Sequence, residues 1–314
     1  MIALLAAVLA ETQGLVFGVA PLGAKLPPNL VSVTAFVAGN EDAEAVRKAL
    51  EADLAKRGKP ALAVVGVAGL GQPGAKVVLE HVSLAGRAVN PHGIAFIAGQ
   101  PASTEKPVAE MAPLVEKSFA DLRKAHAAAG VDGGDVLRLT CLMSSLADLP
   151  AVRGLAEKEF SKAARHYVQL VRSPSRGFVE CETVVRLRSA PGEALRMVQP
   201  EGLAQSPNYS HVALLGPGKV AFSGMYYAGG TQDSDARALF TALDTALAAA
   251  GSGARYVAMS SLYPTSAAAS DLVRRTRFEF YDRSRPPAST MVVFESLPQA
   301  APFAAQVVAV IPGR

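Results

Sequence analysis

Residues 93–100 read GIAFIAGQ, residues 108–129 read VAEMAPLVEKSFADLRKAHAAA, and residues 136–143 read VLRLTCLM. The first and third segments are short apolar runs typical of buried strands, and Gly130 supplies a stop signal for the helix that we expect between them. A second helix is expected from Asp148 to Ala164, followed by strands at 167–171 and 178–185. The apolar residues that recur at helical spacing in the middle segment are Met111, Leu114, Val115, Phe119 and Leu122.

This unit, residues 94–187, recurs along the chain, and repetition lets equivalent positions be compared within one sequence. Residues 220–312 follow the same order of strand, helix, strand, helix, strand and strand. Residues 31–82 keep only the second half, and the preceding helix is absent or reduced to Met1–Glu11. The elements expected in the last copy are strands at 220–225, 256–262, 290–294 and 305–311 and helices at 234–250 and 267–281. Those expected in the first copy are strands at 31–37, 61–67 and 76–82 and a helix at 43–54.

The sequence therefore predicts an α+β fold with three regions: a shortened copy at 1–86 and fuller copies at 87–190 and 200–314. We expect linkers at 85–92 and at 189–207, the latter rich in Pro, Gly and Ser. A small sheet with helices on one face leaves its other face to be covered. The three copies either cover each other around a pseudo-threefold axis or form separate beads. We favour the compact pseudotrimer, because units this small stabilise poorly alone.

Composition excludes several classes of protein. Half of the 314 residues are hydrophobic and 18% are charged, which favours a large core over disorder. The net charge of +4 is spread along the chain without a dense basic run, so no nucleic-acid partner is expected. No stretch is long enough to span a membrane. The spacing of cysteines is not that of a metal site, and we expect no metal or cofactor.

The N-terminus and the cysteines leave alternatives open. Met1–Ala10 is a short apolar run in which Val8-Leu9-Ala10 would suit a signal-peptidase site, but no positive residue precedes it. It equally fits a buried helix or the start of a shortened sequence, so we expect a cytoplasmic protein, with export as the alternative. Cys141 and Cys181 lie in strand-like runs and are interpreted as buried, reduced thiols, with a disulfide as the alternative.

Five motifs resemble the Rid family, the YjgF-like reactive intermediate deaminases also known as "endoribonuclease L-PSP". Ala98-Gly99-Gln100 resembles the family's Ser-Gly-Gln strand end, and Ala128-Ala129-Gly130 its Ala-Gly helix end. Val136–Met143 resembles the next strand, Ala164-Arg165 the Pro-Ala-Arg motif, and Glu180-Cys181-Glu182 the Glu-x-Glu strand. Each motif is weak alone, but their order and spacing match over nearly the whole chain.

The resemblance implies a chorismate mutase-like domain that forms trimers, with a ligand pocket at each interface. It implies hydrolysis of small imines or enamines to 2-oxo acids and ammonia without a cofactor. Arg165 would hold the substrate carboxylate, since arginine binds carboxylates bidentately and stays charged. Glu180 would handle the attacking water as an acid–base group. Substrate-binding roles follow for Gly99, Gln100, Tyr167 and Tyr209, the last in a segment resembling the family's Gly-Pro-Tyr-Ser.

The copies differ at the residues that carry this chemistry. Arg165 precedes Glu180 by fifteen positions, which is the family spacing, and only the middle copy has both. We hypothesise that Tyr209, which introduces the last copy, completes one pocket with Arg165 and Glu180. The corresponding positions are Ser289 and Ala304 in the last copy and Leu62 and Val78 in the first.

Structural explanations compete with these roles. Arg165 ends an expected helix, where a cation interacts favourably with the helix dipole. Glu180 and Glu182 lie two apart on one strand face and fit a solvated edge or arginine partners. Gly99 and Gln100 fit a turn, and His166 fits an ordinary surface or interface residue.

Three functions remain after this comparison. The first is a monomeric pseudotrimer, or a low-order homo-oligomer, that hydrolyses imines as a deaminase. The second is a non-catalytic protein that binds a small carboxylate, such as a 2-oxo acid, or a protein partner; the loss of Arg and Glu in two copies favours it. Ribonuclease activity is the weakest, because no histidine pair or basic groove supports it.

Overall fold

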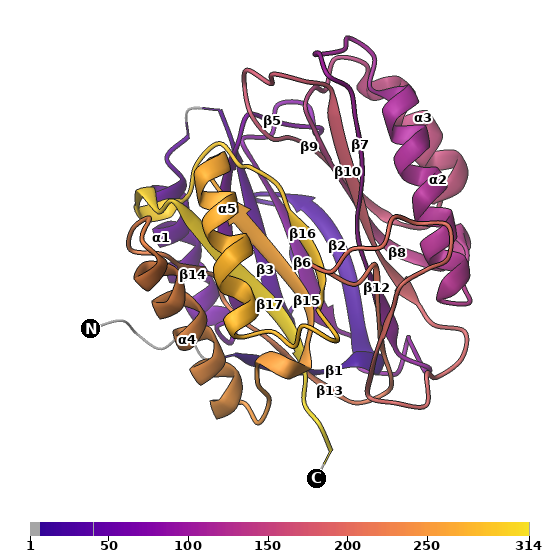
Figure 1. The fold of residues 1–314 in the computed structure, drawn as a ribbon, viewed down its shortest axis with the longest axis vertical. Helices are drawn as coiled ribbons and strands as arrows, with labels where there is room; N and C mark the ends of the chain where they lie inside the picture. Colours follow the sequence, from indigo (N-terminus) through magenta and orange to yellow (C-terminus); the bar gives the residue numbers. More distant parts are fainter. Residues whose placement is uncertain (1–6, 40, 314) are drawn as a thin grey trace.

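The computed structural model describes residues 7–39 and 41–313, which form three β-sheets whose inner faces meet, with the helices on the outside (Figure 1). The predicted α+β class is confirmed. Apolar residues from all three sheets pack together between them, including Phe17, Phe96 and Phe222. No helix in the described part of the chain is both long and apolar enough to cross a membrane.

The four-stranded sheet has the order β2-β6-β3-β4. Helix α1 connects the parallel strands β3 and β4, and Asp42 caps it by accepting hydrogen bonds from the Glu44 and Ala45 amides. Leu50 and Leu54 of α1 pack on the outer face of the sheet. These elements agree with the predicted first copy, apart from the unpredicted β2. Their bounds are β2 Leu15–Pro21, β3 Leu30–Ala38, α1 Ala43–Leu54, β4 Ala61–Val67 and β6 Val77–Leu84.

The seven-stranded sheet has the order β11-β12-β7-β10-β8-β9-β5. The second predicted helix of the middle copy ends at Glu159, and Ala164 already belongs to strand β9, which pairs with β8. The expected linker 189–207 contains a strand, β11, because its apolar residues pair with β12. The bounds are β5 Gly69–Leu70, β7 Ile94–Ser103, α2 Ala112–Ala128, β8 Val136–Met143, α3 Leu149–Glu159, β9 Ala164–Gln169, β10 Phe178–Arg186, β11 Leu195–Val198 and β12 Val212–Leu215.

The six-stranded sheet has the order β1-β13-β17-β15-β16, with β14 also paired to β17. The helix considered for Met1–Glu11 is wrong for Val8–Glu11, which forms strand β1 paired with β13, whereas residues 1–6 lie outside the described residues. Pairing with β13 buries Ala10 and satisfies the edge backbone groups of β13, which a helix would leave unpaired. The bounds are β1 Val8–Glu11, β13 Lys219–Phe222, β14 Tyr226–Tyr227, α4 Asp233–Ala249, β15 Val257–Pro264, α5 Ala267–Thr276, β16 Ala288–Met291 and β17 Phe303–Val310.

Strands from different regions of the chain interlock the three sheets. β1 and β5 come from residues 1–86, yet β1 joins the six-stranded sheet and β5 the seven-stranded one. β12 comes from residues 200–314 and pairs with β7 of the middle region. The arrangement is therefore compact, and separate beads are excluded for the described residues.

Each sheet contributes a polar residue at the same register position. Glu80 of β6 lies opposite Thr34 of β3, Glu182 of β10 opposite Thr140 of β8, and Gln306 of β17 opposite Ser261 of β15. In each sheet, the strand that carries the glutamate or glutamine pairs antiparallel with a strand that has a parallel neighbour on its other side. All six side chains line one cavity between the sheets.

Cys141 and Cys181 form a disulfide, with sulfurs 2.05 Å apart, so the expectation of reduced thiols is wrong. The two residues lie directly opposite each other on β8 and β10. They are 40 positions apart in sequence, and only the strand register brings them together. The bridge is fully buried on the outer face of the sheet, in the same core as α2.

Candidate functional site

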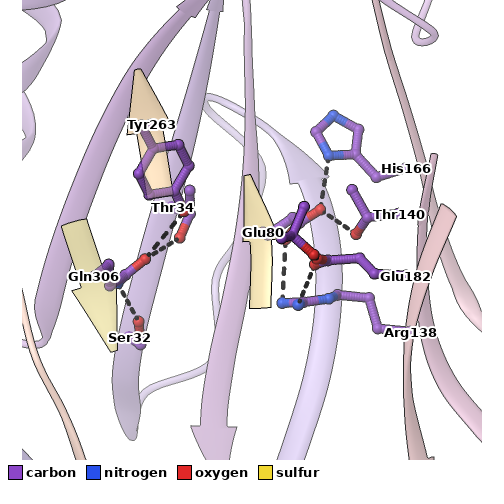
Figure 2. Close-up of polar contacts among 10 residues, drawn as sticks. Ser32, Thr34, Glu80, Arg138, Thr140, His166, Glu182, Tyr263 and Gln306 are labelled. Atoms are coloured by element: carbon purple, nitrogen blue, oxygen red, sulfur yellow. Dashed lines mark hydrogen bonds and ion pairs between the residues drawn. The ribbon is translucent and has the colours of Figure 1, made fainter. Parts of the chain in front are cut away.

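The cavity where the inner faces meet has a volume of about 70 Å³. This is far smaller than the roughly 300–1,000 Å³ of pockets for drug-sized ligands and suits a few waters or a molecule of a few atoms. Its polar wall divides into a charged side and a neutral side (Figure 2).

Arg138 organises the charged side. Its Nη1 lies 3.1 Å from Oε2 of Glu80, and its Nη2 lies 3.4 Å from Oε1 of Glu182. Glu80 also accepts a hydrogen bond from Thr140 Oγ1 at 2.6 Å and lies 2.9 Å from His166 Nδ1. One guanidinium thus serves the buried carboxylate of Glu80 and the partly buried carboxylate of Glu182, on two different sheets, which Figure 2 shows.

The two carboxylates differ in how well they are compensated. Burial alone would raise the pKa of Glu80, but the Arg138 charge and the contacts with His166 and Thr140 hold that pKa to about 2. Burial raises the pKa of Glu182, against the opposing charge of Arg138 and the hydrogen bond from Thr290. Glu80 is therefore a fixed anion, whereas Glu182 is a carboxyl whose ionisation depends on its two partners.

The neutral side is built around Gln306. Its Oε1 accepts hydrogen bonds from Thr34 Oγ1 at 3.3 Å and from Tyr263 at 3.5 Å, and its Nε2 lies 3.5 Å from Ser32 Oγ. These uncharged polar groups hydrogen-bond to one another. The neutral side therefore carries no unpaired charge among the described residues.

Glu180 lies beside this network, on the same face of β10 as Glu182 and two positions away. Its side chain is 8% exposed and has no hydrogen-bond partner within the described part of the chain. Burial, and then the charge of Glu182, raise the pKa of Glu180 to about 8. A buried carboxyl that keeps its proton at neutral pH and lacks a structural partner is a typical functional group.

Gly99 borders the Glu180 carboxyl, and Tyr209 responds to its charge. A Cβ on Gly99 would lie 2.1 Å from Glu180 Oε1, so only glycine leaves room for the carboxyl there. Burial raises the pKa of Tyr209, and the charge of Glu180 raises it further. Of the predicted site residues, Gly99 therefore lies directly against Glu180.

A β-bulge shapes this site. Gln100 pairs with Cys181 and Ile97 with Thr183, so Ala98 and Gly99 together face Glu182 alone. The freed Gly99 amide donates to Thr290 Oγ1 of β16 at 3.1 Å. The bulge thus turns a backbone donor of one sheet toward a side chain of the next.

Gln100 lies in β7 and not in a turn, and it is bound within its surroundings. Its Nε2 donates to the Ala98 carbonyl at 2.8 Å and lies 3.2 Å from His211 Nδ1. Its own carbonyl accepts from Ser118 of α2 at 2.6 Å. These contacts make Gln100 a brace between β7, α2 and the segment that leads into β12.

Arg165 does not join Glu180, because the two side chains lie on opposite faces of the sheet. Arg165 is opposite Leu139 on β8, and Leu139 is opposite Thr183 on β10. Thr183 contacts His126 of α2 at 2.8 Å, so Arg165, Leu139 and Thr183 lie on the face of the sheet that the helices cover. Glu180 is three positions from Thr183 and therefore points inward.

Arg165 instead closes the end of α3. Its Nη1 donates to the carbonyls of Phe160 at 3.0 Å and Ser161 at 3.3 Å, and its Nη2 lies 3.8 Å from Glu157. Tyr167 lies on the same outer face, where burial raises its pKa to about 12 against the charges of Arg165 and Arg153. The interaction with the helix end, the competing structural explanation, is the one present.

Sequence reasoning missed the network around Arg138. His166 was expected at a surface or interface; it is 1% exposed and lies at the contact of two sheets, against Glu80. The available signal was a charged residue within an apolar strand, as in VLRLTCLM around Arg138 and VVLEHV around Glu80. No cluster of three or more potential metal ligands occurs among the described residues.

No protein-family model and no curated protein sequence matches the chain. Its structure is similar to a YjgF-family protein from Neisseria meningitidis (17% identity, 38% of this chain and 97% of that one, TM-score 0.29). It is also similar to a Rid-family protein of unknown function from Yersinia pestis (17% identity, 37% and 98%, TM-score 0.33). A chorismatase is 12% identical over 96% of this chain and 99% of its own, with a TM-score of 0.29. All three TM-scores lie below 0.5, so these likenesses carry no argument about function.

Proposed function

We propose that this chain hydrolyses small imines or enamines in the manner of the Rid family, with Glu180 as the acid–base group. The observation that carries the proposal is the state of Glu180: buried, without a hydrogen-bond partner in the described chain, and with its pKa raised to about 8. Structural carboxylates usually have partners that favour their charged form, as Glu80 has. Glu180 is therefore poised to exchange a proton near neutral pH.

In the proposed reaction, Glu180 first donates a proton to the imine and then accepts one from water. Protonated Glu180 donates to the imine nitrogen, which makes the C=N carbon more electrophilic, and Tyr209 donates a hydrogen bond that orients the substrate. The Glu180 carboxylate then accepts a proton from the water that adds to that carbon. The resulting carbinolamine expels ammonia and leaves a carbonyl compound, so one imine and one water give one oxo product and one ammonia. Acid–base catalysis of this kind contributes about 10²–10⁴-fold.

Arg165 lies outside the proposed site. Its guanidinium is bound to the end of α3 on the outer face, so the resemblance-based role of holding a substrate carboxylate finds no support in its position. Arg138 faces inward, but Glu80 and Glu182 already occupy it.

The test compares imine decay with wild type, Glu180→Gln and Arg165→Ala. 2-Iminopropanoate is generated in situ by oxidation of alanine, and propan-2-imine by oxidation of 2-aminopropane; ammonia release is followed for each. We expect acceleration of at least one imine by wild type, a loss of about 100-fold or more in Glu180→Gln, and little change in Arg165→Ala. Acceleration that survives Glu180→Gln would disprove the assignment.

A non-catalytic binding protein is the second candidate. The observation in its favour is that both arginines considered for a substrate carboxylate are already bound, Arg138 to Glu80 and Glu182, and Arg165 to the end of α3. If wild type accelerates the hydrolysis of neither imine, the non-catalytic binding protein is the favoured function.

We also propose that the functional unit is the monomer. The three sheets already cover one another's inner faces within one chain, so no second copy is needed to close the cavity. Light scattering should give a mass near 32.5 kDa, and a mass three times larger would contradict this assignment.

The disulfide bears on location. Disulfides persist in oxidising compartments and are rare in the cytosol, so the Cys141–Cys181 bridge favours export over the cytoplasmic location expected from the sequence. Thiol labelling of denatured protein from its native source would show two free thiols if the chain resides in a reducing compartment.

A further inference from the structure

We propose that Thr290 is a positioning residue that keeps Glu182 ionised and thereby keeps the proton on the neighbouring Glu180. The inference rests on the proposed role of Glu180 and adds its regulation. A side chain of the six-stranded sheet would thus determine the protonation state of a carboxyl on the seven-stranded sheet.

The direction of the Thr290 hydrogen bonds follows from its single hydroxyl proton. Thr290 Oγ1 accepts from the Gly99 amide at 3.1 Å, and an amide can only donate. The hydroxyl therefore donates its proton to Oε2 of Glu182, 2.6 Å away. That carboxyl oxygen must be an acceptor, and so short a bond is typical of a hydroxyl donating to a carboxylate.

The other oxygen of Glu182 faces a positive charge. Its Oε1 lies 3.4 Å from Arg138 Nη2, so both oxygens contact donors that favour the ionised form. Glu180 has neither kind of partner among the described residues. Two carboxyls on one strand face, two positions apart, resist joint ionisation, and the better-compensated one ionises first. The proton therefore stays on Glu180.

The other titratable groups near Glu180 do not offset this effect. Tyr209 belongs to the segment before β12, and its pKa is raised by burial and by the charge of Glu180. His211, in the same segment, is bound between Gln100 Nε2 and the Ala204 carbonyl. The facing elements β7 and β16 contribute Gly99, Gln100 and Thr290, which do not titrate. Arg138 contacts Glu182 directly and Glu80 contacts Arg138, so both act on Glu180 through Glu182.

The experiment measures the Glu180 titration directly, so it does not depend on enzymatic activity. Protein labelled with ¹³C at the glutamate carboxyl is titrated by NMR, and Glu180→Gln identifies the signal. Thr290→Val removes the hydroxyl at nearly constant volume. We expect the Glu182 midpoint to rise by about one pH unit or more, because a hydrogen bond to a charged group is worth about that much, and the Glu180 midpoint to fall to the extent that Glu182 is then protonated. Thr290→Ser should restore the wild-type midpoints.

Two further variants keep the test decisive. Thr34→Val removes another threonine hydroxyl, which binds neutral Gln306 on the other side of the cavity, and should leave the Glu180 midpoint unchanged. Glu182→Gln removes the charge itself and should lower the midpoint even if Thr290→Val does not fold. An unchanged midpoint in Glu182→Gln, or equal shifts in the Thr290 and Thr34 variants, would overturn the proposal. A wild type inactive toward every imine would defeat the proposed function alone and leave this titration result standing.

Discussion

Replacing Glu180 by glutamine should change how the stability of the protein depends on pH. Burial and the Glu182 charge raise the Glu180 pKa from its ordinary 4.5 to about 8. Between these values the unfolded chain has released a proton that the folded protein still binds. The free energy of unfolding then falls by about 1.4 kcal/mol per pH unit, or about 5 kcal/mol over the interval. This contribution is fully present below pH 4.5 and is lost as the pH rises through 8.

Glutamine occupies the same space and stays neutral, so the variant lacks this loss. The assay is urea unfolding followed by circular dichroism at about pH 5, 7 and 8.5. The free energy of unfolding of Glu180→Gln, minus that of wild type, should increase by about 4 kcal/mol from the lowest to the highest pH. The exposed Glu110→Gln is the matched control and should show a constant difference.

A constant difference for Glu180→Gln as well would refute the reasoning. It would mean that Glu180 ionises alike in the folded and unfolded chain. The buried carboxyl without partners would then not hold its proton, and the acid–base role proposed for it would lose its physical basis.

Two other substitutions test the inner and outer faces of the same sheet. Arg138→Met leaves Glu80 and Glu182 buried without their cation, so it should lower the free energy of unfolding by about 3–5 kcal/mol at neutral pH; a loss below about 1 kcal/mol in urea unfolding would show that the ion pairs are not desolvated. The double variant Cys141→Ala, Cys181→Ala removes a link between residues 40 positions apart and should cost about 4 kcal/mol through the entropy of the unfolded chain. Equal unfolding midpoints for the double variant and oxidised wild type would contradict this, with mass spectrometry confirming the bridge in wild type.

The sequence predicted the elements well, because their signals are local. The strand at 136–143 and the helix at 43–54 have the bounds expected from periodicity and stop signals. The strand Val8–Glu11 was missed because its stability comes from pairing with β13, more than 200 positions away, and not from its own pattern. The disulfide was missed for the same reason, since only the register of β8 and β10 places its cysteines opposite each other.

The candidate site was predicted in part. Gly99 lies against Glu180, but the spacing of fifteen between Arg165 and Glu180 does not fix which face each side chain takes. The faces follow from strand register, which the connection between β9 and β10 sets and the spacing does not reveal. Thr290 was missed because its role arises from a contact between sheets and a bulge at Gly99.

The cavity has a consequence for how such a protein can change. In a homotrimer, symmetry places every residue near the axis three times, so a buried acid there appears as three acids at once. Here the three equivalent positions hold Glu80, Glu182 and Gln306, and a single Arg138 serves both acids. Because the three sheets belong to one chain, a substitution changes the cavity wall formed by one sheet and leaves the walls formed by the other two sheets unchanged. Charged groups that threefold repetition would make intolerable can thus be introduced one at a time.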